Sequence, residues 1–109
     1  MNPPTKVVFS PEAEEQLVWL FHYIAQRSSV GTSLRFTNGI VSHCENLSTF
    51  PFRGTKRDDI RPGLRVTHFK GRVVIAYVVE SEQISILGVF YGGQDYEQII
   101  GDSEQPNNT

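Results

Sequence analysis

The sequence predicts an α+β fold with an N-terminal strand, a hairpin of two helices, a three-strand antiparallel meander and a short C-terminal helix. Apolar residues recur every three or four positions between residues 13 and 47, which is the period of an amphipathic helix. From residue 64 to residue 91, apolar and β-branched runs are separated by short turn signals, as in a meander. A chain of 109 residues, 39% of them hydrophobic, suits one modest core, so we expect residues 1–109 to form a single domain.

A short strand and a well-signalled helix open the chain. Residues 6–9 form a β-rich run. Ser10 can cap the free amides of a helix, Pro11 suits its first position, and three glutamates follow where the helix dipole favours negative charge. We expect this helix to end near Arg27. Its apolar stripe consists of Ala13, Leu17, Leu20, Phe21 and Ile24.

A second helix follows after a very short connection. Ser28-Ser29 can cap it, and Pro51 marks its end. Gly39 lies in the middle of this helix, where glycine costs roughly 1 kcal/mol relative to alanine. We expect close approach of the neighbouring helix to compensate for this cost. The apolar stripe consists of Phe36, Ile40, Cys44 and Leu47, so Cys44 is expected to be an inert core thiol.

The first strands of the meander follow an irregular basic loop. Residues 64–69 alternate in character, and we expect the face that carries Leu64, Val66 and His68 to point toward the helices. Arg65 and Arg72 are then candidates to reach the opposite, less covered face. The continuous apolar run over residues 73–79 is typical of a central strand that is covered on both faces.

The C-terminal third completes the predicted sheet. A turn at residues 80–82 leads into a strand over residues 83–91. After Gly92-Gly93, residues 94–100 are expected to form one or two turns of helix. Residues 101–109 are polar, and we expect them to be a flexible tail.

The net charge of −2 hides a strong asymmetry. Residues 53–72 hold seven of the ten basic residues and two acidic ones, a net charge of +5, so the remainder carries −7. The segment is either a solvated loop and strand edge or a docking site for an acidic partner or a phosphate backbone. A sequence pI near 5.9 weighs against a general nucleic-acid binder, so we expect no sequence-specific DNA binding by this chain alone. The basic residues are Arg53, Lys56, Arg57, Arg61, Arg65, Lys70 and Arg72.

Several classes of protein are not expected. Cys44 is the single cysteine, and neither His22 nor His43, which we expect at the surface, has metal-ligand spacing. We therefore expect no metal and no cofactor. No run of about 18 apolar residues is present, and residues 1–6 do not read as a secretory leader. These features are typical of a cytoplasmic protein.

A series of short motifs carries a resemblance to a known family. They cover roughly residues 6–97, and in this order and spacing the chain resembles the RelE/ParE superfamily of toxins, in particular its ParE-like branch. The motifs are Phe9-Ser10-Pro11-Glu12-Ala13, Leu47…Phe50-Pro51…Gly54, Ile60-Arg61-Pro62-Gly63-Leu64-Arg65, Arg72-Val-Val-Ile-Ala-Tyr77, Ile86-Leu87-Gly88-Val89-Phe90-Tyr91-Gly92 and Gln94-Asp95.

The resemblance implies the toxin of a type II toxin–antitoxin pair with the two-layer RelE/ParE-like fold. Such toxins are neutralised by an antitoxin encoded beside them, here ParD-like or similar, and serve in plasmid stabilisation. ParE-like members inhibit DNA gyrase and block replication, which implies a non-enzymatic inhibitor. RelE-like members are ribosome-dependent endonucleases of messenger RNA, and this remains the alternative. A third possibility is a member that only binds an antitoxin.

The candidate site residues follow from both lines of argument. Arg61, Arg65 and Arg72 can capture carboxylates of an antitoxin or a target, although Arg65 or Arg72 can equally pair with an internal acid such as Glu80 or Asp95. Trp19 and Tyr23 form a second stripe on the first helix, which either borders the core or anchors a protein interface. For the nuclease alternative, the catalytic candidates are Arg65, Arg72 and Tyr91, with His68; the gyrase inhibitor needs no catalytic residue.

Overall fold

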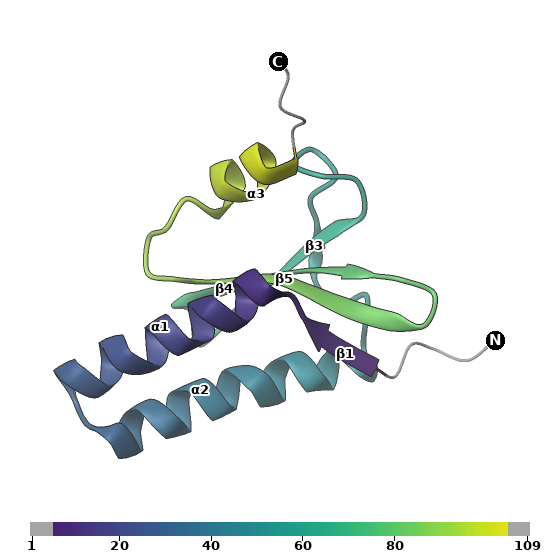
Figure 1. Ribbon diagram of the computed structural model, residues 1–109. Coiled ribbons are helices and arrows are strands. Elements are labelled where there is room, and N and C mark those ends of the chain that lie inside the picture. Colours follow the sequence, from purple (N-terminus) through teal and green to yellow (C-terminus); the bar gives the residue numbers. More distant parts are fainter. Residues whose placement is uncertain (1–5, 105–109) are drawn as a thin grey trace.

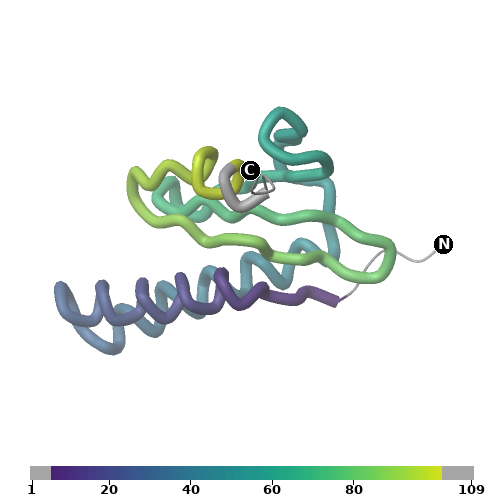
Figure 2. The backbone as a smooth tube through the Cα atoms, turned by 45° about the horizontal axis from the view of Figure 1, so that its top comes forward, coloured from purple at the N-terminus to yellow at the C-terminus, as the bar shows by residue number. Residues whose placement is uncertain are grey.

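One sheet runs through the molecule, with two long helices along one face and a short helix over the other (Figures 1 and 2). This computed structural model describes residues 6–104. The predicted α+β fold and the order of its elements are confirmed. In chain order the elements are β1 (Lys6–Phe9), α1 (Pro11–Arg27), α2 (Val30–Glu45), the 3-10 turn η1 (Asn46–Ser48), β2 (Thr55–Lys56), β3 (Leu64–Phe69), β4 (Val73–Val79), β5 (Gln83–Tyr91) and α3 (Tyr96–Glu104).

The strands lie in the order β1-β5-β4-β3-β2. β1 is parallel to β5, and the other neighbouring strands are antiparallel, so the predicted meander is β3–β4–β5. The two-residue β2 was not predicted, because two exposed residues within an irregular loop show no alternation. Within residues 6–104, every helix is too short or too polar to cross a lipid bilayer.

Both helices of the hairpin begin at the predicted serine caps. Ser10 Oγ accepts a hydrogen bond from the Ala13 amide at 3.0 Å, and Ser29 Oγ accepts one from the Thr32 amide at 3.0 Å. Ser10 Oγ also donates to the Leu87 carbonyl of β5 at 3.2 Å. The cap of α1 therefore fastens the helix to the sheet as well as satisfying a free amide.

The larger core lies between the helix hairpin and the sheet. The hydroxyl of Ser33 in α2 is buried and donates to the Phe21 carbonyl of α1 at 2.6 Å, which holds the two helices close together. Cys44 is buried in this core, and burial raises the pKa of its thiol to about 12, so the thiol stays protonated and unreactive as predicted. Other fully buried members are Leu20, Ile40, Leu47, Ile75, Tyr77, Ile84 and Ile86.

Gly39 is required by a contact that differs from the predicted one. A Cβ atom at this position would lie 2.8 Å from Cζ of Phe69 in β3. The compensation for a mid-helix glycine is therefore close approach of α2 to an aromatic ring of the sheet. The expected approach of the neighbouring helix is wrong, because spacing along one helix does not show which element lies opposite.

The orientation predicted for β3 is also wrong. Leu64 and Val66 belong to a smaller core on the face covered by α3, away from α1 and α2. His68 shares their face by alternation and is exposed. Arg65 pairs in register with Tyr77, a member of the larger core, so Arg65 lies on the helix-covered face. Alternation fixes which residues share a face, but it does not say which face meets the helices.

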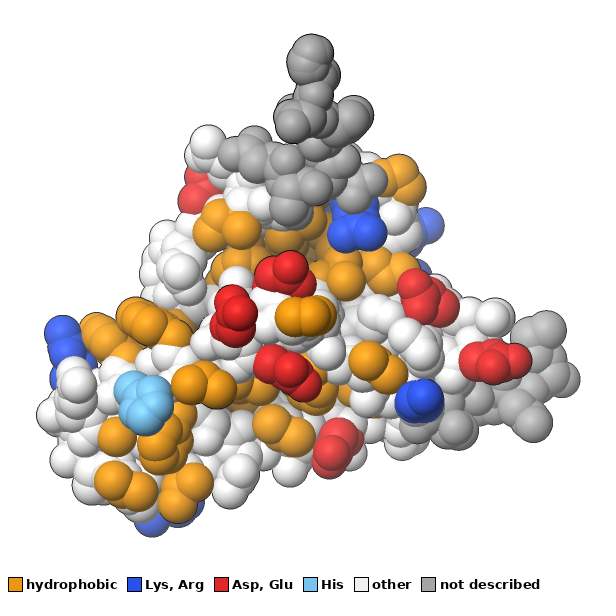
Figure 3. Space-filling model, in the orientation of Figure 1, with side chains coloured by type: hydrophobic (Ala, Val, Ile, Leu, Met, Phe, Trp, Pro, Cys, Tyr) orange, Lys and Arg blue, Asp and Glu red, His pale blue; other side chains and the backbone are white. Residues whose placement is uncertain are grey.

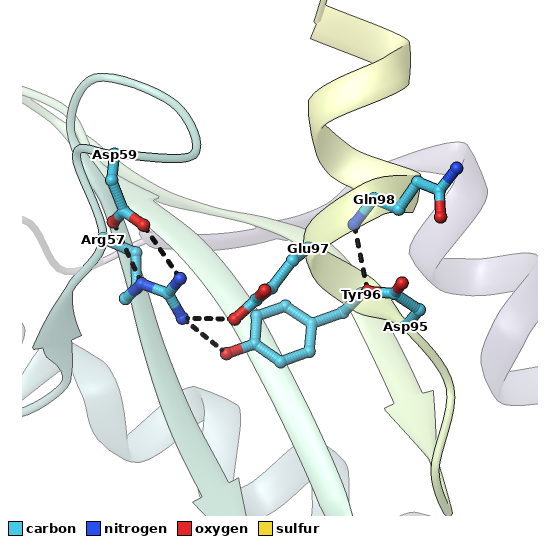
Figure 4. A network of polar contacts seen from close by, with 6 residues as sticks. All are labelled: Arg57, Asp59, Asp95, Tyr96, Glu97 and Gln98. Atoms are coloured by element: carbon cyan, nitrogen blue, oxygen red, sulfur yellow. Dashed lines mark hydrogen bonds and ion pairs between the residues drawn. The ribbon is translucent and has the colours of Figure 1, made fainter.

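A network centred on Arg57 ties α3 to the loop before β3 (Figure 4). The Arg57 guanidinium donates two hydrogen bonds to Asp59, at 3.0 and 2.9 Å, and one to the hydroxyl of Tyr96 at 2.9 Å. It also lies 3.0 Å from the Glu97 carboxylate. These contacts, with the buried side chain of Ile100, anchor the helix in spite of its polar sequence.

The boundary predicted for this last helix needs correction. α3 runs over Tyr96–Glu104, whereas the sequence predicted a helix within residues 94–100 and a flexible tail from residue 101. Residues 101–104 are therefore helical. The remainder of the predicted tail, residues 105–109, lies outside the described residues.

Gly88 in β5 lies beneath an aromatic ring. A Cβ atom at Gly88 would come 2.4 Å from Cε2 of Phe90, which is 2% exposed. We predict that Gly88→Ala lowers the free energy of unfolding by about 1–3 kcal/mol, because a buried ring must shift to make room. Gly93→Ala is the control, since nothing lies within 4 Å of its Cβ position. Urea denaturation measures both, and equal stability of the two variants would contradict the prediction.

His43 was expected at the surface but is only partly exposed. Its Nε2 atom is buried and has no hydrogen-bond partner among residues 6–104, and its ring centroid lies 5.6 Å from that of Phe69. Burial, together with the charge of Arg53, lowers the pKa of His43. His22, by contrast, is exposed as predicted.

We predict that His43 makes folding stability depend on pH. A lowered pKa in the folded state means that the unfolded chain binds the proton more readily, so stability is lost as the pH falls through about 6.5. His43→Gln cannot titrate and should lack this loss. Urea unfolding of both proteins at about pH 7.5 and about pH 5.5 measures the difference. An equal loss of unfolding free energy in both proteins between the two pH values would contradict the prediction.

Candidate functional site

Trp19 and Tyr23 lie at the surface of α1 and continue into a row of aromatic rings. The centroids of Trp19 and Tyr23 are 4.9 Å apart and the rings are stacked, and Tyr23 lies 5.8 Å from Tyr91 at the end of β5. The guanidinium of Arg27 lies 4.1 Å from the centre of the Tyr23 ring. Trp19 is 53% exposed, so it can anchor an interface while its neighbours reach the core.

A groove of about 350 Å³ lies between α1 and the end of β5, and we call it the α1–β5 groove. Gln16 closes its floor, because its Oε1 accepts a hydrogen bond from the Val89 amide of β5 at 2.6 Å. A second hollow continues over the outer flank of α1 and shares Glu15 and Trp19 with the first. The groove is lined by Glu12, Glu15, Gln16, Trp19, Leu20, Val89, Tyr91 and Gln94.

The α1–β5 groove is acidic as well as apolar. Figure 3 shows acidic and apolar side chains side by side over α1. The glutamates of α1 were predicted only to favour the helix dipole, and their position beside Trp19 was not predicted. Their spacing contains the missing signal, because Glu12, Glu15 and Trp19 are three and four residues apart and so share one face of a helix.

Arg65 has a structural partner that was not predicted. Its Nη1 atom donates to the carbonyls of Phe52, at 3.0 Å, and Gly54, at 2.8 Å. Within residues 6–104, neither Arg65 nor Arg72 forms an ion pair, so the alternative of pairing with Glu80 or Asp95 is wrong for both. Arg72 is exposed in the turn between β3 and β4.

The three candidate arginines do not form one surface. Arg65 lies near the start of β3 and Arg72 lies beyond its end, so about 13 Å of strand separates Arg65 from Phe69, the last residue of β3. Arg61 lines a different hollow, together with Ser10, Glu12 and Ile100. The turn after Arg61 forms as expected, since Gly63 has a φ of 83° and its amide donates to Asp58 Oδ1 at 2.8 Å.

The residues considered for a nuclease converge only in part. Arg72 and Tyr91 lie close together at one end of the sheet, since Tyr91 pairs in register with Val73 and the Gly92 amide donates to the Arg72 carbonyl at 2.9 Å. Arg65 lies nearer the other end of β3, and His68 lies on the opposite face of β3 from Arg65. Cleavage of RNA needs a base and cations that reach the same phosphate. Within residues 6–104, the His, Cys, Asp and Glu side chains also form no cluster of three or more that could hold a metal ion.

The segment between α2 and β2 holds two exposed phenyl rings that were not predicted to be site residues. Phe50 is 63% exposed and Phe52 is 61% exposed, and both flank Pro51 just after η1. The sequence contained a signal, because two large apolar residues in a loop are unusual unless the loop binds something. We call residues 49–54 the Phe50–Phe52 loop.

Comparisons with known proteins place the chain in a family. The model of a family described as the ParE toxin of the type II toxin–antitoxin system parDE matches residues 7–96. A solved structure described as the chromosomal ParDE toxin–antitoxin system of P. aeruginosa is similar, with a TM-score of 0.71 and 17% identity over 81% of this chain and 96% of that one. Among curated protein sequences, none matches. Because the family model covers most of the chain, and the structural match confirms the fold, this protein belongs to the ParE toxin family of type II toxin–antitoxin systems.

Proposed function

We propose that this protein is neutralised by a cognate ParD-like antitoxin that occupies the α1–β5 groove, and that the free toxin blocks replication by inhibiting DNA gyrase. Membership of the ParE toxin family supports an antitoxin partner. The observation that supports this location is the exposed Trp19, which lines the groove and stacks on the partly buried Tyr23. The proposal places the protein in the cytoplasm, where gyrase acts, with a role in plasmid stabilisation.

The composition of the groove favours an antitoxin segment with apolar and basic side chains. Trp19 and Tyr91 offer large apolar surfaces, and Glu12 and Glu15 offer carboxylates for lysine or arginine. Tryptophan and tyrosine are the residue types that most often dominate binding energy at interfaces. A disordered tail that folds on binding can fill such a groove with one apolar face, because it becomes ordered only on the toxin.

The geometry favours an inhibitor over an enzyme. Arg65 donates to backbone carbonyls and lies away from Arg72 and Tyr91 along the sheet, and His68 lies on the opposite face of β3 from Arg65. A non-enzymatic toxin needs only surfaces that bind another macromolecule, and exposed groups such as Arg72 and Trp19 can supply them. The RelE-like endonuclease is therefore the second candidate, and its support is the shared superfamily fold alone.

We predict that Trp19→Ala weakens binding to the purified antitoxin by roughly thirtyfold, equivalent to about 2 kcal/mol. The fold should be retained, because half of the side chain is exposed. Leu34→Ala is the matched control, since Leu34 in α2 is 47% exposed and lies outside the groove. Isothermal titration calorimetry measures both affinities. An affinity of the Trp19 variant within twofold of the wild type would place the antitoxin elsewhere.

The purified toxin is expected to inhibit supercoiling by gyrase, and the antitoxin is expected to relieve this inhibition. A supercoiling assay with relaxed plasmid measures the first effect, and addition of the antitoxin measures the second. A parallel reaction with translating ribosomes tests for cleavage of messenger RNA. Cleaved transcripts together with unaffected gyrase would favour the endonuclease, whereas no effect in either assay and no growth arrest on expression would leave an antitoxin-binding protein.

A further inference from the structure

The Phe50–Phe52 loop forms an open hollow, and its residues are distant in sequence from those that line the α1–β5 groove. The hollow has a volume of about 530 Å³ and is lined by residues 49–53. Phe50 and Phe52 are the two most exposed large apolar side chains among residues 6–104, while Pro51 between them is buried. Exposure of two phenyl rings to water is unfavourable unless they have a partner.

Two side chains from the sheet hold this loop in place. The hydroxyl of the fully buried Tyr77 donates to the Pro51 carbonyl at 2.9 Å and accepts from the Gly54 amide at 3.0 Å. Arg65 donates to the carbonyls of Phe52 and Gly54. Gly54 itself has no room for a side chain, since a Cβ atom would lie 2.7 Å from the Tyr77 hydroxyl. The rings are thus presented on a fixed frame, which lowers the entropy lost on binding.

The charge around the loop is positive. Residues 49–54 contain Arg53 and no acidic residue, and the Arg65 guanidinium lies 5.0 Å from the centre of the Phe52 ring. Among residues 6–104, neither arginine is neutralised by an ion pair. The α1–β5 groove has the opposite sign, because glutamates line it. The two surfaces therefore favour partners of different charge.

We infer that the Phe50–Phe52 loop is the surface with which the toxin engages its protein target, by inserting the two rings into an apolar site of the target that acidic side chains border. This inference rests on the proposed function, because it assumes a macromolecular target. Aromatic rings beside arginine can also stack on nucleic-acid bases. A protein is favoured here because the chain outside residues 53–72 carries a net charge of −7, which repels a phosphate backbone.

The test combines one loop variant with three measurements on the full chain. Phe50→Ser together with Phe52→Ser removes the rings, and Leu34→Ser removes a similarly exposed side chain from α2. The loop variant is expected to lose at least tenfold in gyrase inhibition and in growth arrest on expression, and to bind the antitoxin within twofold of the wild type. The Leu34 variant should match the wild type in all three measurements. Urea denaturation verifies that both variants fold.

Arg53 gives a second variant that leaves both rings in place. Arg53→Glu reverses the charge beside the hollow and is expected to weaken gyrase inhibition at least tenfold, whereas Arg53→Lys should retain most of it. This pair keeps the inference testable even where the double serine variant is unstable. Inhibition by Arg53→Glu equal to that of the wild type would remove the electrostatic part of the argument and overturn the proposed acidic partner.

Other outcomes separate this inference from the proposed function. Where the wild type arrests growth without inhibiting gyrase, gyrase is the wrong target, and the loop is judged by growth arrest alone. Full growth arrest by the folded loop variant would overturn the inference. Three other results for the loop variant would also overturn the inference. The first is a loss of antitoxin affinity as large as its loss of growth arrest. The others are a loss, not seen in the Leu34 variant, of binding to a fluorescent oligouridine or of self-association measured by light scattering. A wild type with neither effect contradicts both proposals.

Discussion

The need to cover both faces of β4 determines the architecture of this protein. Its side chains alternate between two cores, with Tyr77 facing α1 and α2 and Ala76 facing α3. A strand that is apolar on both sides cannot leave either face in water, so a second layer must form on each side. The helix hairpin provides one layer with a long apolar stripe. The other layer is only nine residues long, which is why the Arg57 network is needed to hold it.

Covering the sheet in this way leaves two different surfaces at its rims. The α1–β5 groove lies where the polar side of α1 meets the end of the last strand. It is acidic because the glutamates that stabilise the start of the helix also line the groove. The Phe50–Phe52 loop arises where the chain leaves the hairpin to reach the opposite edge of the sheet. Under the proposed function, the opposite charge at the two places would let the antitoxin and the target bind to different surfaces of the toxin.

Local signals in the sequence predicted the elements well, and the failures concern relations between elements. Ser10 and Ser29 were identified as caps because capping depends on the nearest few residues. Two contacts depend on which layer lies opposite: the face to which Leu64 and Val66 point, and the approach of Gly39 to Phe69. The periodicity of the sequence is the same whichever layer lies there. The three candidate arginines lie apart for the same reason, because residues that are close in sequence are spread over an extended hairpin and the loop before it.

The hydrogen bonds of Arg65 to the Phe52 and Gly54 carbonyls suggest a structural role for the motifs that carried the family resemblance. Pieces of three separate motifs meet at one place: Pro51 and Gly54 from the loop, Arg65 from β3 and Tyr77 from β4. Arg65 and Tyr77 are required there by their side-chain hydrogen bonds and Gly54 by lack of space, whereas Pro51 contributes only its backbone carbonyl. The order and spacing of these residues suit the internal frame that they build. Arg53 is exposed beside this frame, whereas the exposed Phe52 ring lies 5.0 Å from the Arg65 guanidinium and so contacts the frame. If the loop binds the target as inferred, substitution of Arg53 would change this binding while the hydrogen bonds of the frame remain in place.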